Sequence, residues 1–229
     1  MVSSSPQGRL PTGFKEVEWL QGSGTQYCET DINPIYSNSS YTSIKGDLTV
    51  LNKTNSQFEI TSRWSQQYSG VMSEFRYGFQ YHYVQRLPQN VYEAQFSYYY
   101  GLLSMANRNV NYINSVFPID IHYELNQNNI IVNQNTISKS SDIKYSATKP
   151  ILIGAYYTGY SADPIHAFNN LTRVKSFNVY DNNNLVYEIV PCYRTSDNKT
   201  GFMKITIADG STTFFPNLGT DEWIIGPVV

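Results

Sequence analysis

The sequence predicts an all-β fold of many short antiparallel strands, arranged as a sandwich or jelly roll. The chain contains 20 tyrosines and 11 phenylalanines among many asparagines, serines and threonines. Aromatic and β-branched residues suit pleated strands, whereas asparagine and glycine suit the turns between them. Apolar and polar residues also alternate in several segments that short turn signals separate. Because no helical pattern of 10–15 residues lies between these segments, a βαβ fold is excluded.

Three segments alternate closely enough to assign a buried and a solvent-facing side. FEITSRW is expected to bury Phe58, Ile60 and Trp64 and to expose Glu59, Thr61 and Arg63. FRYGFQYHY is expected to bury Phe75, Tyr77, Phe79, Tyr81 and Tyr83 and to expose Arg76, Gly78, Gln80 and His82. FPIDIHYEL is expected to bury Ile119, Ile121, Tyr123 and Leu125 and to expose Asp120, His122 and Glu124.

Turn signals punctuate the chain at LPQN 87–90, NQNN 126–129, DNNN 181–184 and ADGS 208–211. The third of these predicts a hairpin in which Phe177 and Val179 share a face with Leu185, Tyr187 and Ile189. Only SYYYGLLSMANRNVNYI, 97–113, is expected to admit a short helix.

The chain is expected to form one domain, 14–229, preceded by an extended arm, 1–13, that Ser, Pro and Gly punctuate. The first residues lack a charged segment followed by an apolar one, so we expect no secretory signal peptide. No run of 18 apolar residues occurs, so no membrane span is expected. Cys28 and Cys192 are expected to be two buried free thiols, with a single bridge between terminal strands as the alternative.

The composition argues against charged partners and against common catalytic sites. Net charge is −2 and 15% of residues are charged, so neither nucleic acid nor an anionic membrane is an expected partner. Asp120 and Glu124 lie about 13 Å apart along an extended strand, too far for the usual carboxylate pair of a glycosidase. His82, His122 and His166 lack metal-ligand spacing, so no metal or other cofactor is expected. DNNNLVYEIVPC lacks the glycine and the glutamate of a calcium loop.

Two segments near the ends of the chain carry a family resemblance. They are LPTGFKEVEWLQGSGTQYCETDI (10–32) and RVKSFNVYDNNNLVYEIVPCYR followed by GFMKITIADGSTTFFPNLGTDEWIIGP (173–194 and 201–227). They resemble the opening and closing strands of concanavalin A-like, laminin-G-like jelly-roll domains. An S-G-T-Q-Y run, an N-x-G-T turn and a terminal Gly-Pro are typical of that family. The resemblance implies a concanavalin A-like jelly-roll β-sandwich of two antiparallel sheets.

The same resemblance implies a role in a bacteriophage particle. Domains of this family occur largely in tail, baseplate and receptor-binding proteins of phages, and also in surface proteins of bacteria. We therefore expect a non-catalytic virion protein that binds host cell-surface glycan, with a bacterial cell surface as the alternative location. Other virion proteins are expected partners, and a homo-oligomer is expected, a trimer if the chain sits on a fibre.

Two alternatives stay open beside the glycan-binding role. One is a purely structural head-fibre, decoration or baseplate subunit that makes protein–protein contacts. The other is a glycan-cleaving enzyme of the same fold, which needs a carboxylate pair that the sequence does not display.

Variable loops on a rigid scaffold commonly carry recognition, and tyrosine rings stack on sugars while amides and carboxylates bond their hydroxyls. The loop AYYTGYSADP supplies four candidate carbohydrate-binding residues: Tyr156, Tyr157, Tyr160 and Asp163. The segment RWSQQYSG supplies two more: Trp64 and Tyr68. The alternative for both groups is packing in the core or the loops, since so many tyrosines cannot all bind a ligand.

Overall fold

The computed structural model describes residues 8–52, 57–86, 91–102, 109–113, 117–138, 143–157, 164–166 and 172–229. Every regular element in these ranges is a β-strand and every described pairing is antiparallel, so the all-β prediction is confirmed. The expected helix within 97–113 is wrong for its described part, which forms strands from Val91 to Leu102 and from Asn109 to Ile113. Tyrosine-rich sequence pairs readily in a sheet, which explains the difference. Of the predicted arm, 1–13, the structure describes the residues from Gly8 onward.

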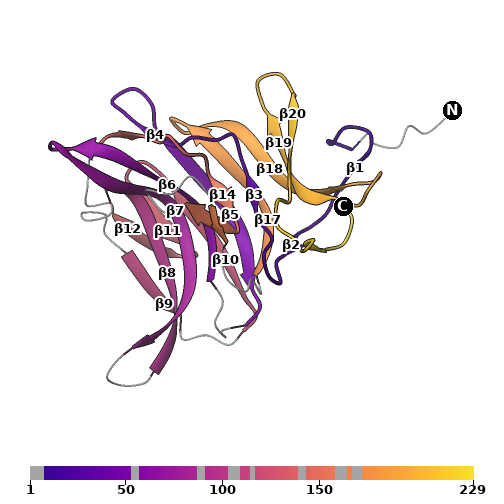
Figure 1. Cartoon of the computed structure of the whole chain (residues 1–229), viewed down its shortest axis with the longest axis horizontal. Helices are drawn as coiled ribbons and strands as arrows, with labels where there is room; N and C mark the ends of the chain where they lie inside the picture. The colour runs from indigo at the N-terminus through magenta and orange to yellow at the C-terminus, as the bar shows by residue number, and fades with distance from the viewer. Residues whose placement is uncertain are drawn as a thin grey trace.

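Two sheets contain most of the described strands (Figure 1). The larger runs in the order β12 (Asn135–Ser138), β11 (Asn129–Val132), β10 (Ile119–Leu125), β5 (Thr42–Val50), β17 (Thr172–Asp181), β18 (Asn184–Arg194), β19 (Thr200–Thr206), β20 (Thr212–Pro216). Three short strands join it at one end: β1 (Phe14–Glu16), β2 (Leu20–Gln21) and β21 (Ile224–Ile225). The smaller runs in the order β3 (Cys28–Glu29), β14 (Leu152–Ile153), β6 (Gln57–Tyr68), β7 (Val71–Arg86), β8 (Val91–Leu102), β9 (Asn109–Ile113).

Two further ladders are short. One pairs β4 (Ile35–Tyr36) with β13 (Tyr145–Ser146), and the other pairs β15 (Ala155–Tyr157) with β16 (Pro164–His166).

The core lies between the two large sheets. Their inward rows belong to one hydrophobic cluster, in which the rings of Phe79 on β7 and Tyr123 on β10 approach to 4.3 Å between centroids. The Tyr77 hydroxyl donates to the carbonyl of Thr42 on the opposite sheet at 3.1 Å. Each fully buried ring contributes about 1.5–3 kcal/mol through removal of apolar surface from water. The predicted inward faces of β7 and β10 are therefore confirmed where their side chains are described.

The 181–184 segment forms a two-residue hairpin turn, as predicted. β17 ends at Asp181 and β18 begins at Asn184, and the backbone φ angles of Asn182 and Asn183 are +49° and +66°. Two consecutive positive φ angles fit the type I′ turn that joins twisted strands, and asparagine tolerates this conformation better than most residues.

A register shift lies next to this turn in the pairing of β17 with β18, and it changes one predicted pairing. The shift lies between Val179 and Tyr180, and the pairs below it match the prediction: Phe177 with Ile189 and Val179 with Tyr187. Leu185 instead lies opposite Tyr180, so its expected place on the face of Phe177 and Val179 is wrong. One extra residue in a strand displaces every side chain beyond it, and simple alternation cannot reveal this.

The predicted solvent-facing side of β6 is also wrong. Its three polar residues are all buried: Glu59, Thr61 and Arg63. The prediction that Gly78 and Gln80 on β7 are exposed is wrong as well, because both are buried. The Gly154 N–H donates to the Glu59 carbonyl at 2.8 Å at the end of the β14–β6 ladder, and the Tyr156 ring of β15 then lies over Arg63 on this side. The alternation itself is correct, but a later segment of the chain covers the polar side.

The SGTQY segment near the start of the chain lies against the NLGTDEW segment near its end. The fully buried side chain of Gln26 organises the first segment. Its oxygen accepts from the backbone N–H groups of Ser23 and Gly24, and its amide donates to the carbonyl of Glu222 at 3.0 Å. Figure 1 correspondingly draws β1 and the C-terminal end on the same side of the molecule.

Asn217 organises the second segment in the same way. Its side-chain oxygen accepts from the N–H groups of Tyr27 and Gly219, and its amide donates to the carbonyl of Asp221 at 2.7 Å. A Cβ at Gly219 would lie 2.1 Å from the carbonyl oxygen of Thr25, so this close approach needs glycine. The two segments that carry the family resemblance therefore form one hydrogen-bonded junction.

Candidate functional site

The two candidates on β6 point into the core. Trp64 is 1% exposed, and its ring lies 5.6 Å from Phe75 and 5.4 Å from Tyr145 between centroids. Tyr68 is partly buried and packs edge-on to Phe75. In this arrangement neither face of the Trp64 ring is open to a ligand, and its position corresponds to the core-packing alternative.

The candidates in the 155–164 loop are divided. Tyr157 is buried in a small cluster with Leu152 and Ala155, whereas Tyr156 is partly exposed. The Tyr156 ring lies 3.8 Å from the guanidinium carbon of Arg63. Tyr160 and Asp163 lie outside the described residues. Among the described candidates, the structure therefore brings Tyr156 together with Arg63 and places the Lys149 ammonium 4.6 Å from the centre of the Tyr157 ring.

The charged group beneath Tyr156 is a buried ion pair. Nη2 of Arg63 donates to both carboxylate oxygens of Glu59, at 2.8 and 2.7 Å, and Thr61 donates to one of them at 3.0 Å. The side chains of Arg63 and Glu59 are 5% and 0% exposed. Ions leave water only at a large cost, which paired charges and hydrogen bonds must offset.

A cleft of about 380 Å³ lies beside the 181–184 turn. The 31–35 segment, the 40–42 segment and the adjoining ends of β17 and β18 form its walls. Its polar and aromatic lining residues are Asp31, Asn33, Ser40, Thr42, Tyr180, Asp181 and Tyr187. Tyr180 also lines a smaller cleft of about 180 Å³, together with Asn126 and Asn183. Aromatic and polar groups thus converge on both sides of one turn.

Hydrogen bonds fix the walls of the larger cleft. The Ser40 hydroxyl donates to Asp181 at 2.6 Å, and the side chain of Asn182 bonds the backbone of Ser39 and Tyr41. These bonds attach the turn to the 37–41 loop. A preformed cleft binds a ligand without paying to order its own walls.

The second carboxylate of the cleft has a cationic and an aromatic neighbour. Lys204 donates to Asp31, and its ammonium lies 5.0 Å from the centre of the Tyr187 ring. The Asp31 side chain is nevertheless 50% exposed. Sequence reasoning treated the 181–184 region only as a hairpin and missed this cleft. The available signal was an aromatic residue on each side of an Asp-Asn turn, but the 31–35 wall is distant in sequence.

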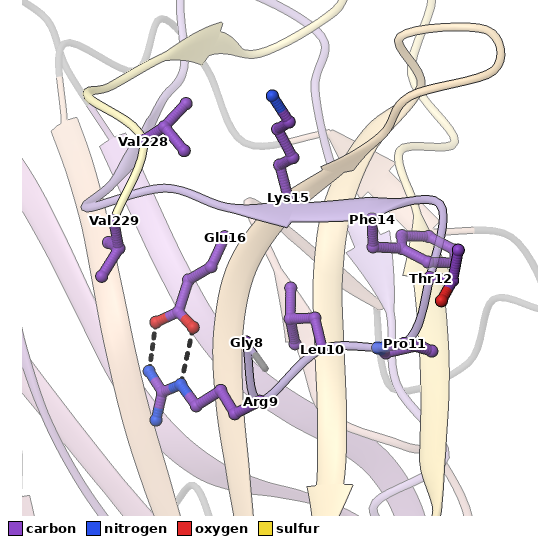
Figure 2. A pocket seen from close by; sticks show the side chains of 10 residues that line it. All are labelled: Gly8, Arg9, Leu10, Pro11, Thr12, Phe14, Lys15, Glu16, Val228 and Val229. Carbon is purple, nitrogen blue, oxygen red and sulfur yellow. Dashed lines mark hydrogen bonds and ion pairs between the residues drawn. The ribbon is translucent and has the colours of Figure 1, made fainter. Parts of the chain in front are cut away.

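A cleft of about 910 Å³ lies between the 8–16 segment and the end of the chain (Figure 2). Figure 2 shows Arg9 facing the carboxylate of Glu16, with which it forms a two-pronged ion pair. Arg9 also contacts Glu188 at 3.1 Å. Much of the remaining lining consists of apolar or small residues, so this cleft offers fewer groups that could orient a polar ligand.

His122 and the two cysteines are further titratable groups that the sequence singled out. His122 is a surface residue, as expected, and bonds Asp47 at 2.9 Å and Glu124 at 3.2 Å. Cys28 and Cys192 are free and buried, as expected, and burial raises the pKa of Cys192 to about 12. No group of three His, Cys, Asp or Glu side chains in the described ranges could hold a metal ion.

Comparisons with known proteins add no identification. No protein-family model matches the chain, and neither a curated protein nor a solved structure does. Within the described ranges, no helix has the length and apolar character needed to cross a membrane. The functional argument therefore depends on the residues themselves and on the family resemblance of the two terminal segments.

Proposed function

We propose that the chain is a non-catalytic bacteriophage virion protein that binds host surface carbohydrate through a concanavalin A-like jelly-roll domain. The resemblance of the two terminal segments suggests the fold family, and their hydrogen-bonded junction is consistent with it. The all-β architecture agrees with that family at the level of fold class. Since fold alone does not give function, the binding role needs a site.

The observation that carries the binding role is the cleft beside the 181–184 turn. Tyr187 offers an aromatic ring for the C–H face of a sugar, and Asn33 offers both a donor and an acceptor for its hydroxyls. Oδ1 of Asp31 and Oδ2 of Asp181 have no hydrogen-bond partner among the described residues and are available as acceptors. This combination of a ring with amide and carboxylate groups suits an uncharged, hydroxyl-rich ligand.

An array of bacterial surface polysaccharides, probed with the purified protein, tests this proposal. We expect binding to at least one polysaccharide, and we expect Asn33→Ala and Asp181→Ala each to weaken it by about tenfold or more, since each removes hydrogen bonds to the ligand. Gln134→Ala, on an exposed turn, is the matched control and should bind as the wild type does. Absence of binding across the array would refute the carbohydrate role, and release of reducing sugar would refute the non-catalytic one.

A structural role in the particle is the second candidate, and one observation favours it. Several large apolar residues are exposed: Val71, Met72, Ile224, Ile225, Val228 and Val229. Val71 and Met72 are neighbours in the sequence, as are Ile224 and Ile225, and contiguous exposed apolar patches commonly mark contacts with other proteins. Sedimentation of the purified chain tests this candidate, because Val71→Ser with Met72→Ser should shift an oligomer toward the monomer if these residues hold it together.

A further inference from the structure

Arg63 has hydrogen-bond donors that the protein does not use. A guanidinium carries five N–H donors, and the bonds of Arg63 to Glu59 come from Nη2 alone. Nε is buried and has no acceptor among the described residues. Native structures rarely leave a buried donor unpaired, so Nε of Arg63 is a candidate contact for a ligand.

The unused donor lies beside a flat aromatic surface. The Tyr156 ring lies over the guanidinium at 3.8 Å and is itself partly exposed, so it is the outer layer at this point. A modest attraction holds a ring on a guanidinium, and the ring is able to turn aside for a ligand that replaces it. Displacement of the ring would give a planar polar group access to the edge of Arg63.

Two ion pairs of described residues lie around this point. Register places Arg76 directly opposite Arg63, and Nε of Arg76 donates to Glu74 at 2.8 Å while Arg63 holds Glu59. Two arginines and two glutamates therefore cancel on this side of β6 and β7. An additional anion would bring an uncompensated charge into a buried site, which is costly, whereas a neutral acceptor would not.

We infer that Arg63 and Tyr156 form a binding site for the acetamido group of an N-acetylated amino sugar. The acetamido carbonyl accepts from Nε of Arg63, and its methyl group and amide plane pack against the displaced Tyr156 ring. An amide satisfies all three conditions, because it is planar, neutral and a strong acceptor. The inference rests on the proposed carbohydrate role and names a sugar class for a second site, separate from the cleft beside the 181–184 turn.

Titration with defined monosaccharides tests the inference on the intact chain. The probes are N-acetylglucosamine and N-acetylgalactosamine, compared with glucose, galactose and glucuronic acid at equal ionic strength. The readout is the ¹H–¹⁵N resonance of Arg63 Nε, identified by its loss in Arg63→Lys. We expect at least one N-acetylated sugar to shift this resonance and to bind about tenfold or more tightly than its parent hexose, since a site built to hydrogen-bond a group rejects the analogue without it.

Variants separate direct contact from general effects. Arg63→Lys keeps the charge but loses the guanidinium edge and should abolish the preference for the acetamido group, whereas Arg194→Lys, at the end of β18, should retain it. If Arg63→Lys does not fold, the wild-type comparison between sugars decides the question alone, and the remaining Arg Nε resonances identify Arg63 by elimination through single Arg→Lys variants.

Equal binding of hexose and N-acetylhexosamine, stronger binding of glucuronic acid, or an unmoved Arg63 resonance would each overturn the inference. Array binding to glycans without acetamido groups would overturn it while leaving the proposed function intact. Failure of every glycan would instead remove the proposed function itself.

Discussion

Two strand faces with the same sequence pattern have opposite environments in this protein. One is the polar side of β6 and β7, which we name the covered face and define by Glu59, Thr61, Arg63, Arg76 and Gln80. The other is the outer side of β5, β10 and β17, which we name the open face and define by Lys45, Asp47, Asp120, His122, Glu124 and Lys175. The covered face buries Glu59 and Arg63 almost completely, whereas the Asp120 side chain on the open face is 77% exposed.

The difference shows where an ion pair affects the stability of the protein. Ion pairs on the open face, such as Lys175 with Asp120 at 3.2 Å, lie in solvent and contribute little. The pair on the covered face has lost its hydration, so each partner depends on the other. The effect of a polar residue in an alternating strand on stability therefore depends on whether other parts of the chain cover it.

The largest expected effect comes from breaking the buried pair. Glu59→Gln removes the charge that compensates Arg63, so we expect the free energy of unfolding to fall by about 3–5 kcal/mol. Asp120→Asn on the open face is the control, with an expected loss below about 1 kcal/mol. Urea denaturation of the two variants and the wild type measures both values. Similar losses in the two variants would contradict the contrast between the faces.

A smaller effect is expected at the residue that covers Arg63. Tyr156→Ala removes the ring from the guanidinium and admits water to the ion pair, which should cost about 1–2 kcal/mol in urea denaturation. Tyr156→Phe keeps the ring and should remain within about 0.5 kcal/mol of the wild type. An unchanged stability in Tyr156→Ala would show that the ring does not protect the pair.

The smallest effect is a pH dependence on the open face. Partial burial lowers the pKa of His122, but the hydrogen bonds to Asp47 and Glu124 outweigh it and hold that pKa above its ordinary value. The contribution to stability is therefore complete below the unfolded pKa of about 6.5 and is lost as pH rises through the higher folded pKa.

His122→Asn should remove this pH dependence, which solvent limits to less than about 1 kcal/mol. The measurement is the free energy of unfolding from urea titrations at several pH values between about 6 and 8. A wild-type stability that increases with pH over this range, relative to His122→Asn, would contradict the assigned direction.

Much of the fold follows from local pattern in the sequence. The inward rows of β7 and β10 alternate strictly, and the Asn-rich 181–184 turn has the backbone that such residues favour. These features depend on neighbours within a few residues. They are the kind of feature that a single sequence specifies well.

The candidate site depends on contacts that local pattern does not contain. Arg63 is buried because residues about ninety positions later cover it, and the cleft at Tyr187 has a wall at 31–35. The register shift before Tyr180 likewise displaced Leu185 from its predicted row. Trp64 illustrates the converse, since an aromatic residue chosen for its chemistry proved to be part of the core.

The central claim is that recognition occurs in the cleft beside the 181–184 turn and not on the open face. Backbone ¹H–¹⁵N NMR, recorded during titration with the polysaccharide fragment that binds most strongly on the array, tests it most directly. The account predicts that the largest shifts fall on the amides of Asp31, Asn33 and Asp181, while those of Asp120 and His122 stay in place. The largest shifts at Asp120 and His122, with the 31–33 and 181–184 amides unmoved, would contradict it.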